Sequence, residues 1–193
     1  MYTSMAEVLN DGRNGHFRLE QFQITERNRP WRDYIPDGKY VRLLGSDGCI
    51  MSDTPMEQRT NRDFVINAHG DVFIAGLGIG MIVLPIQGKK EVESVTILEK
   101  YEEVIELVGN QLPLNEKVKI IHGDVFTYEF PKGTKFDSIY FDIWNWVNDE
   151  IWNEEMKPLR RKYLKYRRSL KENPKAFIKC WAEYQAKNNL RLL

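Results

Sequence analysis

The stretch Asp71-Val72-Phe73-Ile74-Ala75-Gly76-Leu77-Gly78-Ile79-Gly80-Met81 decides the fold. Its first five residues form a short, mostly apolar run, which predicts a buried β-strand. The turn that follows holds three glycines, and because glycine has no side chain, such a turn lets the backbone approach a ligand closely. The sequence therefore predicts a turn that binds a nucleotide-type ligand, with the candidate residues Gly76, Leu77, Gly78, Gly80 and Met81.

Further strands and helices alternate downstream of this turn. Apolar runs predict four more strands, at residues 94–98, 118–121, 137–141 and 176–181. Helices are expected to begin at residue 81, to cover residues 101–108, and to restart at Pro158. This alternation predicts an α/β fold with a mostly parallel, twisted sheet, right-handed crossovers and helices on both faces.

Acidic residues follow three of the predicted strands directly. Glu99 ends the second strand, 19 positions after Gly80, while Asp124 and Asp142 end the third and fourth. Ligands of parallel sheets bind beyond the carboxyl ends of the strands, and a carboxylate there can accept two hydroxyl hydrogen bonds from a ribose. The alternative is that the glycines only make a tight turn and the acids are solvated. We favour a binding site, to which these residues contribute: Glu99, Lys100, Gly123, Asp124, Val125 and Asp142.

The region before the glycine turn has a different character. Residues 1–38 are polar and are predicted to form an irregular arm, followed by a β-hairpin around residues 45–48. Thr54 and Glu57 have the spacing of a capping box, which predicts a helix that runs up to Gly70. The expected organisation is a single domain, made of the arm 1–38, the hairpin and helix 39–70, and a core 71–193.

Composition excludes several other classes of function. Lys plus Arg and Asp plus Glu both number 28, so the overall charge does not favour nucleic acid as a partner. No apolar run reaches the roughly 18 residues of a membrane span, and residues 1–15 lack the core of a signal peptide, so a cytoplasmic protein is expected. The two cysteines and three histidines are scattered, so no metal site is predicted.

The segment 157–171 carries eight basic residues and no acid, which leaves a contact with nucleic acid open. A solvated helix face is the favoured interpretation. Four apolar residues at helical spacing explain the segment as a packed helix: Leu159, Tyr163, Tyr166 and Leu170.

The spacing Gly-x-Gly-x-Gly places the third glycine one residue too early for a dinucleotide fingerprint, which disfavours NAD. It resembles motif I of class I S-adenosylmethionine (SAM)-dependent methyltransferases, and the resemblance covers about residues 71–145. The resemblance implies a Rossmann-like methyltransferase fold with SAM as cofactor. It also implies that the glycine turn lies against the methionine part of SAM, Glu99 holds the ribose, and Asp124 lies by the adenine.

Within that superfamily the chain looks most like the spermidine-synthase-like branch. There a hairpin and a helix precede the glycine strand, and residues 137–142 resemble that branch's Asp-x-x-x-x-Asp strand, whose last Asp is catalytic. Met51-Ser52-Asp53-Thr54-Pro55, the glycine turn and Asp142-Ile143-Trp144 together resemble small methyltransferase-like proteins of phages and bacteria. Ile79 stands where aminopropyltransferases carry an Asp.

The leading hypothesis is a SAM-dependent methyltransferase of unknown acceptor. Asp142 is the candidate catalytic base or amine-orienting group, Asn145 is expected to position the acceptor, and Trp144 and Trp146 either wall the acceptor site or pack. The alternatives are an aminopropyltransferase that uses decarboxylated SAM and a binding protein without catalysis. The superfamily's last two strands are missing from the pattern, so a second copy covering that sheet edge, as in a homodimer, is also envisaged.

Overall fold

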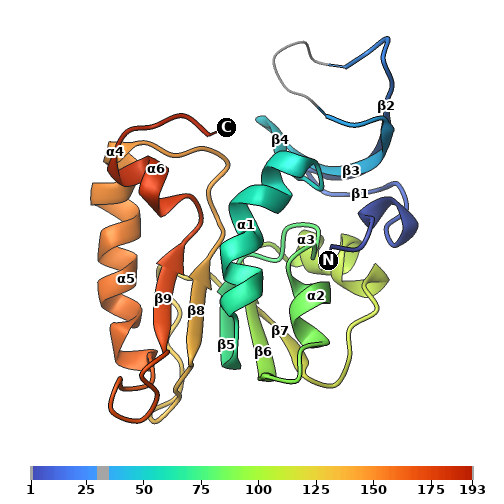
Figure 1. The fold of residues 1–193 in the computed structure, drawn as a ribbon. Helices are drawn as coiled ribbons and strands as arrows, with labels where there is room; N and C mark the ends of the chain where they lie inside the picture. The colour runs from blue at the N-terminus through green and yellow to red at the C-terminus, as the bar shows by residue number, and fades with distance from the viewer. Residues whose placement is uncertain (1, 30–34, 193) are drawn as a thin grey trace.

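The computed structural model describes residues 2–29 and 35–192, which form two sheets with flanking helices (Figure 1). One sheet is antiparallel, with the strand order β1 (Gly12–Asn14), β2 (Phe17–Ile24), β3 (Gly38–Gly45) and β4 (Gly48–Ser52). The other is parallel, with the order β7 (Val118–His122), β6 (Val92–Glu99), β5 (Gly70–Ala75), β8 (Ser138–Phe141) and β9 (Phe177–Cys180). The predicted α/β architecture with its parallel sheet is confirmed.

Alternate residues of β5 face opposite sides of the parallel sheet. Val72 and Ile74 belong to a core that also includes side chains of α1 (Pro55–Asn67), α2 (Val83–Gln87) and α3 (Glu102–Leu107). Phe73 points the other way and stacks on Tyr163 of α5 (Lys157–Tyr163), with the ring centroids 5.3 Å apart. Helices therefore cover both faces, as the sequence predicted. The chain order reverses between β5 and β8, and ligands of such sheets bind at this point.

The N-terminal region is not the irregular arm that the sequence analysis predicted for residues 1–38. Gly12–Asn14 and Phe17–Ile24 are strands, and β2 pairs with β3 along its whole length. Met5 is fully buried, and its backbone N–H donates to Asp53 Oδ2 at 3.1 Å, while Val41 N–H donates to Asp53 Oδ1 at 2.7 Å. Part of the predicted arm, residues 30–34, lies outside the described residues.

The predicted capping box of the first helix is also wrong. Thr54 makes no side-chain cap, and its hydroxyl lies 2.9 Å from the Ser52 hydroxyl instead. Glu57 turns inward and is only 8% exposed, because the hairpin lies over this end of the helix and encloses it. The helix ends at Asn67, and Gly70, with a φ of 61°, begins β5.

The helical segment that precedes β9 begins earlier than predicted. It consists of α4 (Asp149–Ile151), a π-helical turn (Trp152–Met156), α5 and a final 3-10 turn (Leu164–Tyr166). Leu159, Tyr163 and Tyr166 are buried as expected, whereas Leu170 lies beyond the helix and is 50% exposed. The remaining short helix, α6 (Glu183–Lys187), follows β9. Within the described residues, no helix has the length and apolar character that crossing a membrane requires.

Several basic residues of the segment 157–171 form ion pairs with acidic residues of other segments. Arg160 pairs with Glu183, and Lys165 pairs with Glu129. Arg168 bridges the carboxylates of Asp71 and Asp137 at the amino ends of two parallel strands. These pairs give part of the basic run a structural role.

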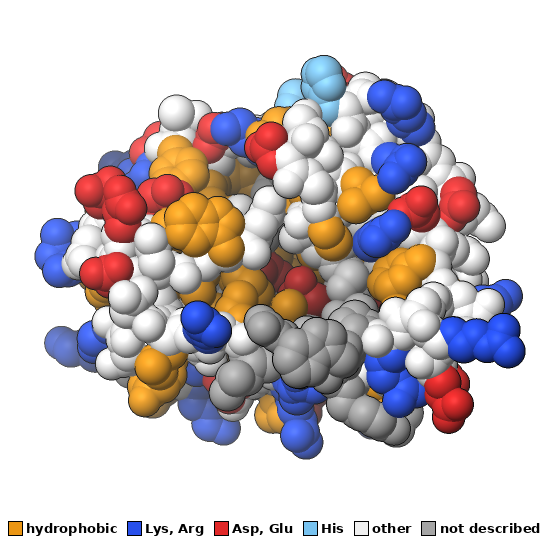
Figure 2. Space-filling view, turned by 90° about the horizontal axis from the view of Figure 1, so that it is seen from above, with side chains coloured by type: hydrophobic (Ala, Val, Ile, Leu, Met, Phe, Trp, Pro, Cys, Tyr) orange, Lys and Arg blue, Asp and Glu red, His pale blue; other side chains and the backbone are white. Residues whose placement is uncertain are grey.

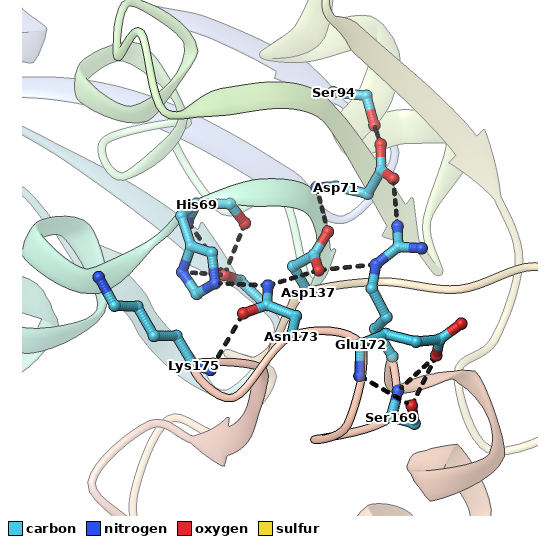
Figure 3. Close-up of polar contacts among 10 residues, drawn as sticks. His69, Asp71, Ser94, Asp137, Ser169, Glu172, Asn173 and Lys175 are labelled. Carbon is cyan, nitrogen blue, oxygen red and sulfur yellow. Dashed lines mark hydrogen bonds and ion pairs between the residues drawn. The ribbon is translucent and has the colours of Figure 1, made fainter.

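A polar network ties the amino ends of β5 and β8 together (Figure 3). Arg168 donates to Asp137 at 2.7 Å and to Asp71 at 2.8 Å, and Asn173 also donates to Asp137 at 2.7 Å. Burial alone would raise the pKa of Asp137, but the hydrogen bonds from Arg168 and Asn173 outweigh it and hold that pKa below its usual value. A Cβ on Gly70 would clash with the Asp137 carboxylate, so only glycine fits there. This network anchors the sheet at the end opposite the glycine turn.

Candidate functional site

A cavity of about 590 Å³ lies at the carboxyl ends of the parallel strands. The glycine turn and the segments that follow β6, β7 and β8 line one side, and the β3–β4 hairpin, including Met51, lines the other. Seen from above, the molecule is hollowed near its centre, and acidic side chains are visible inside the hollow (Figure 2). Small-molecule sites in proteins fall in the same range of volume.

The glycine turn approaches its neighbours so closely that side chains are excluded. Gly76, Gly78 and Gly80 have φ values of 97°, 54° and 74°, in the left-handed region that favours glycine. A Cβ on Gly76 would clash with the backbone carbonyl oxygen of Asp142, and one on Gly78 would clash with the sulfur of Met51. The turn therefore needs these glycines for its shape and for its contact with β8.

Of the five site residues predicted from the turn, only some line the cavity. Gly76 and Gly78 line the cavity. Gly80 packs against Leu112, while Leu77 and Met81 are buried with 3% and 1% of their surface exposed, and these three do not line it. A ligand in this cavity would therefore not contact Leu77, Gly80 or Met81 directly.

Glu99 is built into the wall of the cavity and is 6% exposed. Its Oε2 accepts a hydrogen bond from Leu77 N–H at 2.8 Å, and its Oε1 accepts one from Tyr101 N–H at 3.0 Å. Burial raises the pKa of Glu99, and these backbone hydrogen bonds oppose the rise. Each carboxylate oxygen keeps a second lone pair, so the group can still accept hydroxyl hydrogen bonds from a ligand.

Lys100 and Asp124 form an ion pair at the side of the cavity beyond β7. The distance between Lys100 Nζ and Asp124 Oδ2 is 3.1 Å, and Asp124 Oδ1 accepts from Phe126 N–H at 2.9 Å. Gly123 and Val125 line the same side, and Phe126 adds an aromatic ring that is 44% exposed. Phe126 was not predicted, because a single aromatic residue four positions after the end of β7 has no sequence signature.

Asp142 projects into the cavity without a partner. Its backbone N–H donates to Ala75 O at 2.9 Å, which fixes the strand end beside the glycine turn. Its carboxylate forms no hydrogen bond or ion pair with any described residue, and burial raises its pKa to about 7. A carboxyl group with that pKa can take up and release a proton near neutral pH.

Glu57 is a further acidic residue of the cavity, which the sequence analysis did not select as a site residue. Burial is the main reason that its pKa is raised to about 8, the charge of Asp142 adds to the rise, and a hydrogen bond from the Ser52 backbone opposes it. The position was interpreted as part of a capping box. Its inward direction depends on the hairpin, whose placement over the helix no local pattern encodes.

Asn145 lies at the entrance, where a second groove of about 420 Å³ adjoins the main cavity. Ile143, Trp144, Asn145 and Glu155 line both. The Trp144 indole donates to Glu155 Oε2 at 2.8 Å, so this ring is held in place, whereas Trp146 is 59% exposed.

Nine of the predicted site residues thus line one cavity. They are Gly76, Gly78, Glu99, Lys100, Gly123, Asp124, Val125, Asp142 and Asn145. Across the described ranges, no three His, Cys, Asp or Glu side chains are grouped as a metal site would require. The arrangement offers hydroxyl acceptors, an aromatic ring and an unpaired carboxylate.

No protein-family profile and no curated protein sequence matches the chain. Among solved structures, it is similar to the plantazolicin methyltransferase BpumL in complex with SAH, with 16% identity and a TM-score of 0.45 over 59% of this chain and 44% of that one. It is also similar to the CcbJ methyltransferase from Streptomyces caelestis, with 16% identity and a TM-score of 0.46 over 59% of this chain and 46% of that one. The chain spans less than half the length of these two proteins. Because the identities and TM-scores are low, a function for this chain has to be argued from its cavity.

Proposed function

We propose that this chain is a SAM-dependent methyltransferase whose donor and acceptor meet in the cavity beside Asp142. The observation that carries the proposal is the meeting of a glycine turn with three carboxylates, each at the end of a different parallel strand. These carboxylates belong to Glu99, Asp124 and Asp142.

The residues present fit the donor, part by part. Glu99 would accept hydrogen bonds from the ribose hydroxyls through its free lone pairs. Asp124 and the Phe126 ring flank the space where the adenine would lie. The backbone of Gly76 and Gly78 would face the methionine part, and Met51, which now lies against Gly78, would rotate away about its flexible side chain.

Bound SAM supplies a methyl group that is already activated by the positive sulfonium. The protein residues then have three tasks, which are to align the acceptor, to exclude water and to remove a proton where the acceptor carries one. Asp142 suits the last task, because its carboxylate is unpaired and its pKa of about 7 lies near neutral pH. Asn145, at the junction of the cavity and the groove, would position the acceptor.

Titration calorimetry of the full chain with SAM, S-adenosylhomocysteine (SAH) and methylthioadenosine tests this function. A methyltransferase binds SAM and SAH with a Kd below about 1 mM, the upper end of common enzyme KM values. Preference for methylthioadenosine would instead favour aminopropyl transfer, the activity of the spermidine-synthase-like branch. Binding of SAM without any turnover would favour a binding protein, and absence of binding by all three would refute both enzymatic interpretations.

A further inference from the structure

The groove that adjoins the main cavity is acidic and aromatic. No Lys or Arg is among its described lining residues. Three carboxylates and two tryptophans line it, namely Glu150, Glu154, Glu155, Trp144 and Trp146. Glu155 and Trp144 also line the main cavity, so the groove adjoins the space that Asp142 lines.

Nearby cations do not neutralise this groove. Arg160, on the helix that follows it, pairs with Glu183 and lies 5.9 Å over the ring of Trp152. Glu150 and Glu154 make no ion pair with any described residue. Their negative charge is therefore available to an incoming ligand.

The inner end of the route holds two carboxyl groups that form no ion pair with any described residue. Glu57 is 8% exposed, and no cationic side chain pairs with it in the described parts of the chain. The Asp142 carboxylate, which lines the same cavity, is unpaired as well among the described residues. Among the residues that the structure describes, the only Lys or Arg that lines the main cavity is Lys100, which is held by Asp124 at 3.1 Å.

The buried carboxylate of Glu57 interacts electrostatically with that of Asp142, which lines the same cavity, and such an arrangement is costly unless a cation joins the two groups. Aromatic faces also attract cations, and they cover the apolar stem of a long cationic ligand. The carboxylates and the aromatic faces therefore both favour a cationic ligand with an apolar stem.

Resting on the proposed function, we propose that the methyl acceptor is an aliphatic amine that enters as an ammonium ion. It passes the carboxylates of Glu150, Glu154 and Glu155 beside Trp144 and arrives between Glu57 and Asp142. A free amine and a lysine side chain present the same ammonium group, so both fit this route.

The ammonium gives one proton to the Asp142 carboxylate, and the freed nitrogen lone pair forms a bond to the methyl carbon of the donor. The bond between that carbon and sulfur breaks, and its electron pair stays on the sulfur, which becomes a neutral thioether. The product leaves as a methylated ammonium, and Asp142 returns its proton to solvent.

The experiment incubates the full chain with SAM labelled in its methyl group and three acceptors, which are 1,4-diaminobutane, a lysine-containing peptide and 1,4-butanediol. We expect labelled N-methyl product from at least one amine and none from the diol, and the two amines distinguish a free ligand from a side chain. Labelled diol without labelled amine would overturn the proposal, and so would SAM binding with no labelled amine.

A charge-matched pair of variants tests the groove itself. The double variant Glu150→Gln/Glu154→Gln is expected to raise the KM for the amine at least tenfold while the Kd for SAM stays unchanged. Glu91→Gln/Glu116→Gln removes the same charge from exposed positions outside both cavities and is expected to change neither value. An unchanged amine KM in the groove variant would refute the route. A wild-type chain that does not bind SAM would instead refute the proposed function. Failure of the amine route and failure of the proposed function are therefore distinguishable.

Discussion

Glu99 Oε2 accepts a hydrogen bond from the backbone N–H of Leu77 at 2.8 Å, although 22 positions separate the two residues. The strand-end acid therefore supports the glycine turn before any ligand is bound. A site that is fixed in this way loses less entropy when the ligand binds.

Replacement of Glu99 tests this double role. Glu99→Ala removes both the support of the turn and the proposed ribose acceptor, so we expect the Kd for SAM to rise at least about tenfold, equivalent to about 1.4 kcal/mol. Calorimetry measures the change. Glu102→Gln, an exposed acid three positions on, is the control and should leave the Kd unchanged. Equal affinities of wild type and Glu99→Ala would contradict the role of Glu99.

Gly76 tests whether the turn requires its left-handed conformation. Gly76→Ala forces a Cβ against the rigid carbonyl of Asp142, at a φ of 97°. We expect a loss of about 2 kcal/mol or more in the free energy of unfolding, measured by urea denaturation. Gly88→Ala is the matched control, because Gly88 has a φ of −83° and open space around it. A Gly76→Ala chain as stable as Gly88→Ala would show that the clash is relieved without cost.

Glu57 makes the stability of the free protein depend on pH. Its pKa is raised to about 8 in the folded state, so the folded chain holds this proton more tightly than the unfolded chain, whose Glu titrates near about 4.3. Stability therefore falls as the pH rises from about 4 to about 8, a change opposite in sign to that of a salt-bridged acid.

Glu57→Gln should remove this dependence. We expect the variant to be more stable than wild type by about 1 kcal/mol or more at pH 8 and similar to it at pH 4, since one unit of pKa is worth about 1.4 kcal/mol. Urea denaturation at the two pH values checks this. A variant that is less stable at pH 8 would mean that the charged form of Glu57 is well solvated.

Arg168 tests the network at the opposite end of the sheet. Arg168→Gln leaves the buried Asp137 without its ion pair, so we expect a loss of about 1–3 kcal/mol at pH 7. Because the folded pKa of Asp137 is lowered, this stabilisation is present above about pH 4 and fades as the pH falls through the folded value. The difference between wild type and variant should narrow in acid. The exposed Arg161→Gln is the control, and equal losses in both would assign the effect to net charge.

The parallel sheet could be predicted because its signals are local. Each strand is a short apolar run, and the acids follow the runs directly, so Glu99, Asp124 and Asp142 were placed at strand ends from the sequence alone. The sheet then brings these ends together, as parallel topology requires.

The N-terminal sheet and the position of Glu57 could not be predicted, because they depend on contacts between residues that are distant in the sequence. The Asp53 carboxylate accepts a hydrogen bond from the backbone N–H of Met5, which lies 48 positions earlier in the chain. This contact helps to order a region whose polar composition indicated an irregular arm. In β2, Phe17 and Leu19 alternate with polar residues, but only its pairing with β3 identifies the segment as a strand. Glu57 became part of the cavity for the same reason, because the hairpin encloses it.

A crystal structure of the full chain with SAH bound tests the central claim most directly. We expect the ribose hydroxyls within hydrogen-bond distance of Glu99, the adenine beside Asp124 and Phe126, and the sulfur directed toward Asp142. SAH bound elsewhere, or a cavity that stays free of it at saturating concentration, would contradict the assignment of this site to methyl transfer.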